Sequence, residues 1–258
     1  MRVGFAPVHA EVRFAIRQAE ELGRNLMKRA ILASAMTMLL LGTAPAALAQ
    51  SNDASLTWSA GSAVGNLDIV ANLEGTSRRL LKGNVGEGLA KVVINNGELS
   101  WQPLLATSWE QLEPQRWRFK IRQGVTFHDG SPMTVEDVVY TVNKVADPAS
   151  SKTSILQNIA GAEVVDQETV DILTKSPDFF AYRAAAEISI QKQGWGQDDP
   201  AIAQTTLIGT GPYKLESVSP ARDLAVLARN DSYWGDNSAS LERIKLRVIP
   251  DSGARLAA

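Results

Sequence analysis

The sequence contains no cysteine and only two histidines, His9 and His128. The absence of cysteine excludes a disulfide framework, a thiolate zinc site, a cysteine nucleophile and a cysteine-linked lipid anchor. A histidine-based metal site or a Ser-His-Asp triad would depend on His128 alone if the N-terminus is removed, so neither is favoured. The sequence gives no reason to expect a metal ion or another cofactor.

An excess of positive charge is also missing. The formal net charge of the 258 residues is −2, which gives no indication of a nucleic-acid partner. Hydrophobic residues make up 45% and charged residues 21% of the chain, as is usual for a soluble globular protein. The length suits one large domain or two small ones.

No apolar run is long enough to span a membrane, but one run resembles an export signal. Met27-Lys28-Arg29 is basic, residues 30–42 are uncharged and largely apolar, and small residues stand at Ala47 and Ala49. This three-part pattern predicts a signal peptide over residues 27–49, whereas a spanning helix needs about 20 apolar residues. Residues 1–26 would then be an upstream extension, and we expect translation to start at Met27. The sequence therefore predicts a periplasmic protein that is not lipid-anchored.

The stretch from Trp117 to Val145 carries a strand signal, a turn signal and a helix signal in succession. Apolar and basic residues alternate over residues 116–122, as in a strand with one buried face. His128-Asp129-Gly130 predicts a turn, and Thr134 with Asp137 predicts a capping box. Valines at helical spacing follow, so we expect a helix that ends before Pro148.

Other segments predict hairpins and short helices. Turns are expected at residues 95–97, 166–168 and 220–223. Helices are expected from Thr76 or Ser77 through Leu89, and over residues 179–190.

Three groups of side chains could carry chemistry. His128 and Asp129 could act as a general base with its orienting carboxylate in a secreted hydrolase, although such a turn more often binds its own backbone. A basic strand face over residues 116–122 could attract an anion, although a charged face usually only solvates and protects a sheet. Six tryptophans could line a ligand cleft or fill a core.

Several motifs occur in the order typical of one family. They are Asn84-Val85-Gly86-Glu87-Gly88-Leu89, Pro103-Leu104-Leu105-Ala106, Trp117 to Asp137, Gly209-Thr210-Gly211-Pro212-Tyr213, Asn230-Asp231 with Tyr233-Trp234-Gly235, and Ile249-Pro250-Asp251. In this combination the chain resembles the family 5 extracellular solute-binding proteins, which serve importers of peptides, nickel and opines. Gly86 departs from the pattern, because the family usually has tyrosine there.

The resemblance implies an α/β fold of the type II periplasmic-binding-protein class, with mixed sheets flanked by helices. Residues 50–86 and 197–258 would form a discontinuous and incomplete first lobe, and residues 87–196 an inserted accessory subdomain. The second lobe would be absent, so we expect the N-terminal part of a longer protein with weak or absent ligand binding. A non-functional fragment is an alternative. The stretch from Trp117 to Val145 would then be a scaffold that does not touch the ligand.

The resemblance also implies a function and a site. The protein would be a non-enzymatic, monomeric receptor that captures peptides for an ABC permease, with a metal chelate, an opine or a sugar as alternative ligands. In oligopeptide-binding members, three consecutive residues before the Tyr-Glu-Gly segment face the ligand. The same spacing places this contact at Glu74, Gly75 and Thr76. Glu74 could attract a ligand amine, and the backbone at Gly75-Thr76 could pair with an extended peptide.

Overall fold

The computed structural model describes residues 54–65, 67–68, 75–150, 154–197, 202–236 and 241–257. The predicted signal peptide and the extension before it lie outside the described residues. Contacts group Asp53–Ala258 into one compact unit. None of the helices in the described ranges combines the length and the apolar character that crossing a bilayer requires.

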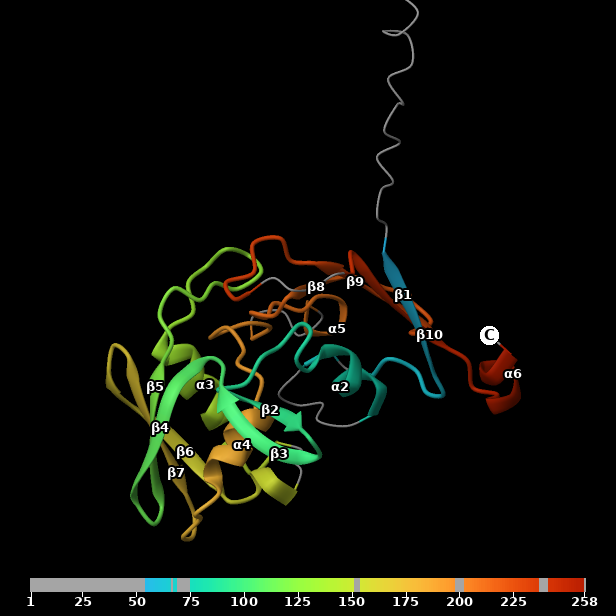
Figure 1. Cartoon of the computed structure of the whole chain (residues 1–258). Helices are drawn as coiled ribbons and strands as arrows, with labels where there is room; N and C mark the ends of the chain where they lie inside the picture. The colour runs from blue at the N-terminus through green and yellow to red at the C-terminus, as the bar shows by residue number, and fades with distance from the viewer. Residues whose placement is uncertain are drawn as a thin grey trace, which may run out of the picture. The chain divides into compact units, whose positions relative to one another are not determined.

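The elements follow one another along the chain as labelled in Figure 1. They are β1 (Ser55–Ala60), α2 (Gly75–Leu81), β2 (Ala90–Asn95), β3 (Glu98–Pro103), β4 (Ala106–Glu113), β5 (Arg116–Ile121), α3 (Val135–Ala146), η1 (Ser154–Leu156), β6 (Ile159–Asp166), β7 (Thr169–Thr174), α4 (Ala181–Glu187), α5 (Ile202–Thr205), β8 (Tyr213–Val218), β9 (Leu224–Arg229), β10 (Arg243–Val248) and α6 (Ser252–Ala257).

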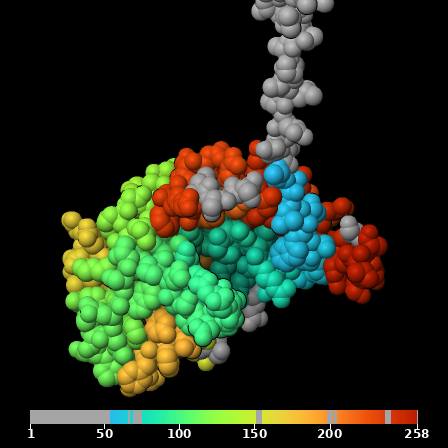
Figure 2. Space-filling view, in the orientation of Figure 1, coloured from blue at the N-terminus to red at the C-terminus, as the bar shows by residue number. Residues whose placement is uncertain are grey.

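One four-stranded sheet joins segments that are far apart in the sequence. Its order is β1-β10-β9-β8, with β1 parallel to β10 and the other pairs antiparallel. Ala225, Leu227 and Leu246 bury their side chains fully beneath it. Figures 1 and 2 both show β1 (blue) beside the red C-terminal segment, where Gly61 faces the guanidinium of Arg255. β1 is therefore held in the fold by its pairing with β10 (Arg243–Val248), which lies near the other end of the chain.

The second four-stranded sheet is antiparallel and comes from one continuous part of the chain. Its order is β4-β5-β7-β6, and α3 packs against β6 and β7. Phe119, Val170 and Ile172 from the sheet and Val138 and Val142 from α3 are almost completely buried. The apolar stripe of the helix thus meets the apolar face of the sheet, as its periodicity predicts.

The prediction for residues 117–145 is confirmed in detail. β5 alternates between buried and more exposed residues, and α3 begins with the predicted capping box. The backbone N–H of Thr134 donates to a carboxylate oxygen of Asp137 at 2.7 Å. This bond satisfies a backbone donor that the first turn of a helix otherwise leaves unpaired.

The hairpin prediction for residues 95–97 is also confirmed. β2 and β3 pair antiparallel around Asn96 and Gly97, whose φ angles are 52° and 84°. Two successive residues with positive φ are typical of a type I′ turn, for which Asn-Gly is the favoured sequence. The hairpin lies against α4, where Trp101 and Tyr182 make an edge-to-face contact with ring centroids 5.8 Å apart.

Two helix predictions are too long. α2 ends at Leu81 rather than continuing to Leu89, because Gly83 takes a φ of 77° and the chain turns back to form a bridge between Lys82 and Gly86. α4 covers only Ala181–Glu187, and the residues after it run extended. Apolar spacing alone therefore overestimated the length of both helices. Glycine and tertiary hydrogen bonds ended the helical segments earlier than the spacing predicts.

Candidate functional site

A hollow in the described part of the chain lies along α3. This cavity, which we call the α3 cavity, has a volume of about 660 Å³. Its walls are α3, one residue of β6, the segment 193–197 and Asp68. The lining residues are Asp68, Glu136, Val139, Tyr140, Asn143, Lys144, Asp147, Val164, Gln193, Trp195, Gly196 and Gln197.

α3 presents different faces to the core and to the cavity. Four of its valines are buried on the side of the core, while Glu136, Tyr140, Asn143 and Asp147 line the cavity and recur at spacings of four, three and four residues. Residues at these spacings lie on one side of a helix. The sequence analysis used only the apolar stripe and missed this polar one. The same periodicity argument, applied to the outer face, would have indicated it.

Segment 191–193 is fixed to α3 by hydrogen bonds to two helix residues. The backbone N–H of Gln193 donates to the Asp137 carboxylate at 2.8 Å. The N–H of Gln191 donates to the hydroxyl of Thr141 at 3.0 Å, and Thr141 is fully buried. Because both acceptors are inside the molecule, the wall that carries Trp195 is held rigidly against the helix.

Lys144 organises the charge at one side of the cavity. Its ammonium group donates to the carboxylate of Asp68 at 2.8 Å and to the side-chain oxygen of Gln191 at 2.9 Å. Asp68 belongs to the segment that follows β1, so this ion pair connects the helix to a distant part of the chain. The positive charge of Lys144 is therefore largely neutralised where it meets the cavity.

Two donors in this wall are buried without a partner among the described residues. They are the indole N–H of Trp195 and the side-chain N–H₂ of Gln191. A buried donor that makes no hydrogen bond costs about 1–3 kcal/mol.

The predicted contact residues Glu74, Gly75 and Thr76 are only partly visible. Glu74 lies outside the described residues. Gly75 is exposed, has a φ of 76° and begins α2, while Thr76 is buried with its hydroxyl 2.6 Å from that of Ser62. Neither Gly75 nor Thr76 is among the residues that line the α3 cavity.

His128 and Asp129 fix the turn rather than forming a catalytic pair. The Nδ1 atom of His128 accepts a hydrogen bond from the N–H of Gly209 at 3.3 Å, so its Nε2–H donates to the carbonyl of Gly211 at 3.0 Å. Asp129 instead binds Lys192 at 2.7 Å and Ser131. The imidazole thus has backbone partners on both nitrogens.

The same contacts explain the electrostatics of the turn. Burial lowers the pKa of His128 below its usual range, although the hydrogen bond to Gly211 opposes the shift. Burial alone would raise the pKa of Asp129, but the hydrogen bonds from Lys192 and Ser131 outweigh it and lower the pKa to about 2. These two pKa shifts therefore favour a neutral His128 beside an ionised Asp129.

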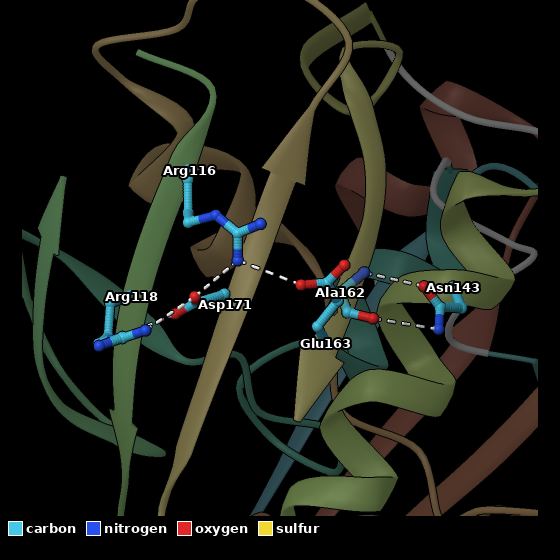
Figure 3. Close-up of polar contacts among 6 residues, drawn as sticks. All are labelled: Arg116, Arg118, Asn143, Ala162, Glu163 and Asp171. Atoms are coloured by element: carbon cyan, nitrogen blue, oxygen red, sulfur yellow. Dashed lines mark hydrogen bonds and ion pairs between the residues drawn. The ribbon is translucent and has the colours of Figure 1, made fainter. Parts of the chain in front are cut away.

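The basic strand face is paired with acidic residues of the neighbouring strands. Asp171 on β7 is almost fully buried and accepts hydrogen bonds from Arg116 at 2.8 Å and from Arg118 at 2.8 and 3.0 Å (Figure 3). Arg116 also reaches Glu163 on β6. These ion pairs compensate the charges of the strand face, a pairing that neither interpretation of the basic residues had predicted.

The tryptophans have mixed roles. Trp101, Trp109 and Trp117 surround Tyr182 with ring centroids 5.5–6.0 Å away; Trp117 belongs to the core, and Trp109 and Tyr182 pack against it. Trp195 lines the α3 cavity, and Trp234 lies beneath the guanidinium of Arg122 at 5.2 Å. No group of three or more potential metal-ligating side chains occurs in the described ranges.

The fold is that of a solute-binding protein. A family model described as bacterial extracellular solute-binding proteins, family 5 Middle, matches residues 100–258, and the chain belongs to this family. The type II periplasmic-binding-protein fold predicted above is confirmed by solved structures. One of them, the oligopeptide-binding protein AppA from Bacillus subtilis in complex with a nonapeptide, has a TM-score of 0.70 at 22% identity and covers 79% of this chain and 41% of its own.

Two curated relatives differ in their described roles. The periplasmic oligopeptide-binding protein OppA of Salmonella typhimurium is 27% identical over 251 residues, which cover 84% of this chain and 44% of OppA. The HTH-type transcriptional regulator SgrR of Pectobacterium atrosepticum is 30% identical over 166 residues, covering 64% of this chain and 28% of SgrR. The chain spans less than half the length of either relative.

Proposed function

We propose that this protein captures peptides and delivers them to an ABC permease, and that the α3 cavity is part of the binding surface. The observation that carries the proposal is a cavity of about 660 Å³ with aromatic, amide and charged walls, in a chain of the family 5 solute-binding proteins. Ligand sites typically have this size and this mixture of apolar surface with a few placed polar groups. OppA and AppA, which are described as oligopeptide-binding proteins, support peptides as the ligand class.

We also propose a domain organisation and a cellular location for this protein. Residues 50–86 and 197–258 would form a first lobe and residues 87–196 an inserted subdomain, in line with the separate sheets β1-β10-β9-β8 and β4-β5-β7-β6. The protein would be exported by a signal peptide over residues 27–49 and act as a periplasmic monomer. Glu74, Gly75 and Thr76 remain proposed ligand contacts. The exposed backbone at Gly75, next to buried Thr76, suits pairing with an extended peptide.

The helix of the scaffold stretch enters the proposed site. The sequence analysis expected residues 117–145 to stay away from the ligand, whereas this proposal would place Glu136, Tyr140 and Lys144 in contact with it, because they line the cavity. The turn at His128 supports the architecture, while the helix after it carries the proposed contacts. Gln197 donates a hydrogen bond to the Tyr140 hydroxyl at 3.3 Å, which holds the phenol at the cavity edge.

NMR spectroscopy of the ¹⁵N-labelled chain tests this proposal, because each of the six tryptophans gives one indole N–H signal. A mixture of di- to hexapeptides is expected to shift the Trp195 signal, which Trp195→Phe identifies. Tyr140→Ala should weaken the response several-fold, and the control Glu98→Gln, in the β2–β3 hairpin, should not. Glu74→Gln tests the proposed loop contact in the same assay.

The same NMR titration can be carried out with other classes of ligand. A response to an opine, a sugar or a nickel–histidine chelate, with none to peptides, would replace the peptide proposal with that ligand class. The absence of any shift at Trp195 while another indole responds would move the site away from the α3 cavity.

A further inference from the structure

The side chain of Asn143 on α3 binds both backbone groups of one residue in β6. The N–H of Ala162 donates to Asn143 Oδ1 at 2.9 Å, and Asn143 Nδ2 donates to the carbonyl of Ala162 at 3.4 Å. Figure 3 shows this amide on the α3 side of β6, whereas Asp171 of β7 lies on the other side of that strand. Because the single N–H of Ala162 is used by Asn143, Ala162 and its partner Ile172 are a non-hydrogen-bonded pair of the sheet.

β6 carries an extra residue immediately before this contact. Ile159 pairs with Thr174 and Gly161 with Leu173, so Ala160 has no partner on β7. A bulge of this kind bends a strand and re-aims the side chains that follow it. The amide contact lies directly after the bulge, where it can hold the re-aimed strand in place.

Gly161 allows the amide of Asn143 to reach the strand. Its φ is 151°, which residues with a side chain rarely adopt. A Cβ atom at this position would lie 2.8 Å from Asn143 Oδ1. The bulge, the glycine and the amide contact therefore depend on one another.

The bulge decides which side chain of β6 faces the α3 cavity. In the observed register Val164 stands opposite buried Val170 and lines the cavity. Glu163 points to the other face, where its carboxylate accepts a hydrogen bond from Arg116 at 3.1 Å. Without the extra residue, pairing continued from Ile159 would bring Glu163 opposite Val170. A shift of one residue turns every side chain of a strand to the other face, so a carboxylate would then replace the valine.

We propose that Asn143 is a positioning residue of the α3 cavity: it holds the bulge of β6, keeps Val164 in the cavity wall, and so prepares this wall for an apolar side chain of the ligand. Val139 and Trp195 also line the cavity and extend the apolar surface. This inference rests on the proposed function and adds to it the kind of side chain that the site prefers.

NMR spectroscopy of the chain without ligand tests the role of Asn143 in the strand. The Cα atoms of a non-hydrogen-bonded antiparallel pair lie about 4.5 Å apart, so an NOE between the Hα protons of Ala162 and Ile172 is expected. Asn143→Ala should weaken this NOE and accelerate amide exchange at Ala162 about tenfold. Gln115→Ala is the matched control, because it removes a side-chain amide hydrogen bond of 2.9 Å to the carbonyl of Lys175, next to β7. The control should change neither signal.

A variant on the strand separates positioning from direct ligand contact, since Asn143 itself lines the cavity. Gly161 is not among the lining residues, and Gly161→Ala should disturb the same amide contact from the side of the sheet. Binding of Ala-Leu-Ala, followed at the indole signal of Trp195, should weaken about threefold in either single variant. The double variant should be no weaker than the single ones, because both substitutions break one contact.

Matched peptides test the preferred side chain. The wild type should bind Ala-Leu-Ala about fivefold more tightly than Ala-Asn-Ala, whose central side chain has a similar shape but is polar. In Asn143→Ala and in Gly161→Ala this preference should fall below about twofold, whereas Gln115→Ala should retain it. Circular dichroism and thermal unfolding confirm that each variant is folded.

The outcomes are distinguishable. An unchanged NOE between Ala162 and Ile172 in both single variants would overturn the inference, because the strand would then hold its register without the amide. Weaker binding in Asn143→Ala, with Gly161→Ala equal to wild type, would also overturn it and make Asn143 a direct ligand contact. Equal binding of Ala-Leu-Ala and Ala-Asn-Ala by the wild type would overturn the apolar preference and leave the proposed function standing. Failure of every peptide to bind would overturn the proposed function and this preference, while the NOE and exchange data would still decide the role of Asn143 in the strand.

Discussion

The carboxylate of Glu87 accepts a hydrogen bond of 2.6 Å from the hydroxyl of Tyr233, although 146 positions separate the two residues. Thr210 and the indole of Trp234 donate to the other oxygen at 2.9 and 3.0 Å. Glu87 is almost fully buried, and burial raises its pKa, while the three hydrogen bonds oppose the shift. One carboxylate thus joins the segments around residues 87, 210 and 233.

Replacing Glu87 should therefore loosen three segments at once. Glu87→Ala removes the common acceptor and leaves donors of Tyr233 and Trp234 unpaired, so we expect a loss of about 2 kcal/mol in the free energy of unfolding. Glu87→Gln keeps the shape and one acceptor oxygen and should cost about half as much. Urea unfolding of both variants provides the measurement, with Glu98→Gln as an exposed control. Equal stability of Glu87→Ala and the control would refute the role of the network.

The glycines of the Gly209-Thr210-Gly211 segment are required by close backbone contact. A Cβ atom at Gly209 would lie 2.0 Å from the carbonyl oxygen of Val85. Since backbone cannot move aside easily, Gly209→Ala should cost about 3 kcal/mol. Gly61→Ala is the matched control, because its nearest neighbour is the flexible end of Arg255 at 3.0 Å. Thermal unfolding should show a large decrease for the first variant and little change for the second.

The lowered pKa of His128 predicts how stability depends on pH. The folded protein favours the neutral imidazole, so the unfolded chain takes up a proton first as the pH falls below about 6.5. The contribution of His128 is therefore present above this pH and is lost as the pH decreases. Comparing wild type with His128→Gln at pH 7.5 and 5.5 should show the stability advantage of wild type shrinking at the lower pH. An advantage that grows instead would mean that the folded state binds the proton more tightly.

Asp171 should contribute more to stability than its neighbour Glu163. Its side chain is 1% exposed and serves two arginines, and the hydrogen bonds from Arg118 and Arg116 lower its pKa although burial opposes the shift. Asp171→Asn leaves both guanidinium groups without their carboxylate, and the melting temperature should fall by about 5 °C. Glu163 is 55% exposed, so Glu163→Gln should change it little. Similar melting temperatures for the two variants would contradict this assignment.

Local signals predicted much of the fold correctly. The alternation in residues 116–121 gave β5, the valine spacing gave α3, and Asn96-Gly97 gave a hairpin turn. Each of these elements is determined by neighbours within a few positions, so local periodicity and turn chemistry were sufficient.

Long-range contacts explain what the sequence could not show. The segment after α2 has apolar residues at helical spacing, but its carbonyls at Asn84 and Val85 accept hydrogen bonds from Tyr213 and Gly211. These partners are more than 120 positions away. Similarly, the cavity wall at Trp195 depends on hydrogen bonds to Asp137 and Thr141 from segment 191–193, which no local pattern reveals.

The division of α3 into two faces has a consequence for how this protein can change. The buried valines of α3 and the polar residues that line the cavity occupy different sides of one helix. If the proposed site binds the ligand, substitutions at Glu136, Tyr140 and Asp147 should change the ligand without disturbing the buried valines. Asn143 is the exception, because its side chain binds the backbone of Ala162 on β6 (Figure 3). These three positions, on α3 and at its C-cap, are thus open to mutation, which makes this surface a suitable starting point for redesigning the proposed ligand contacts.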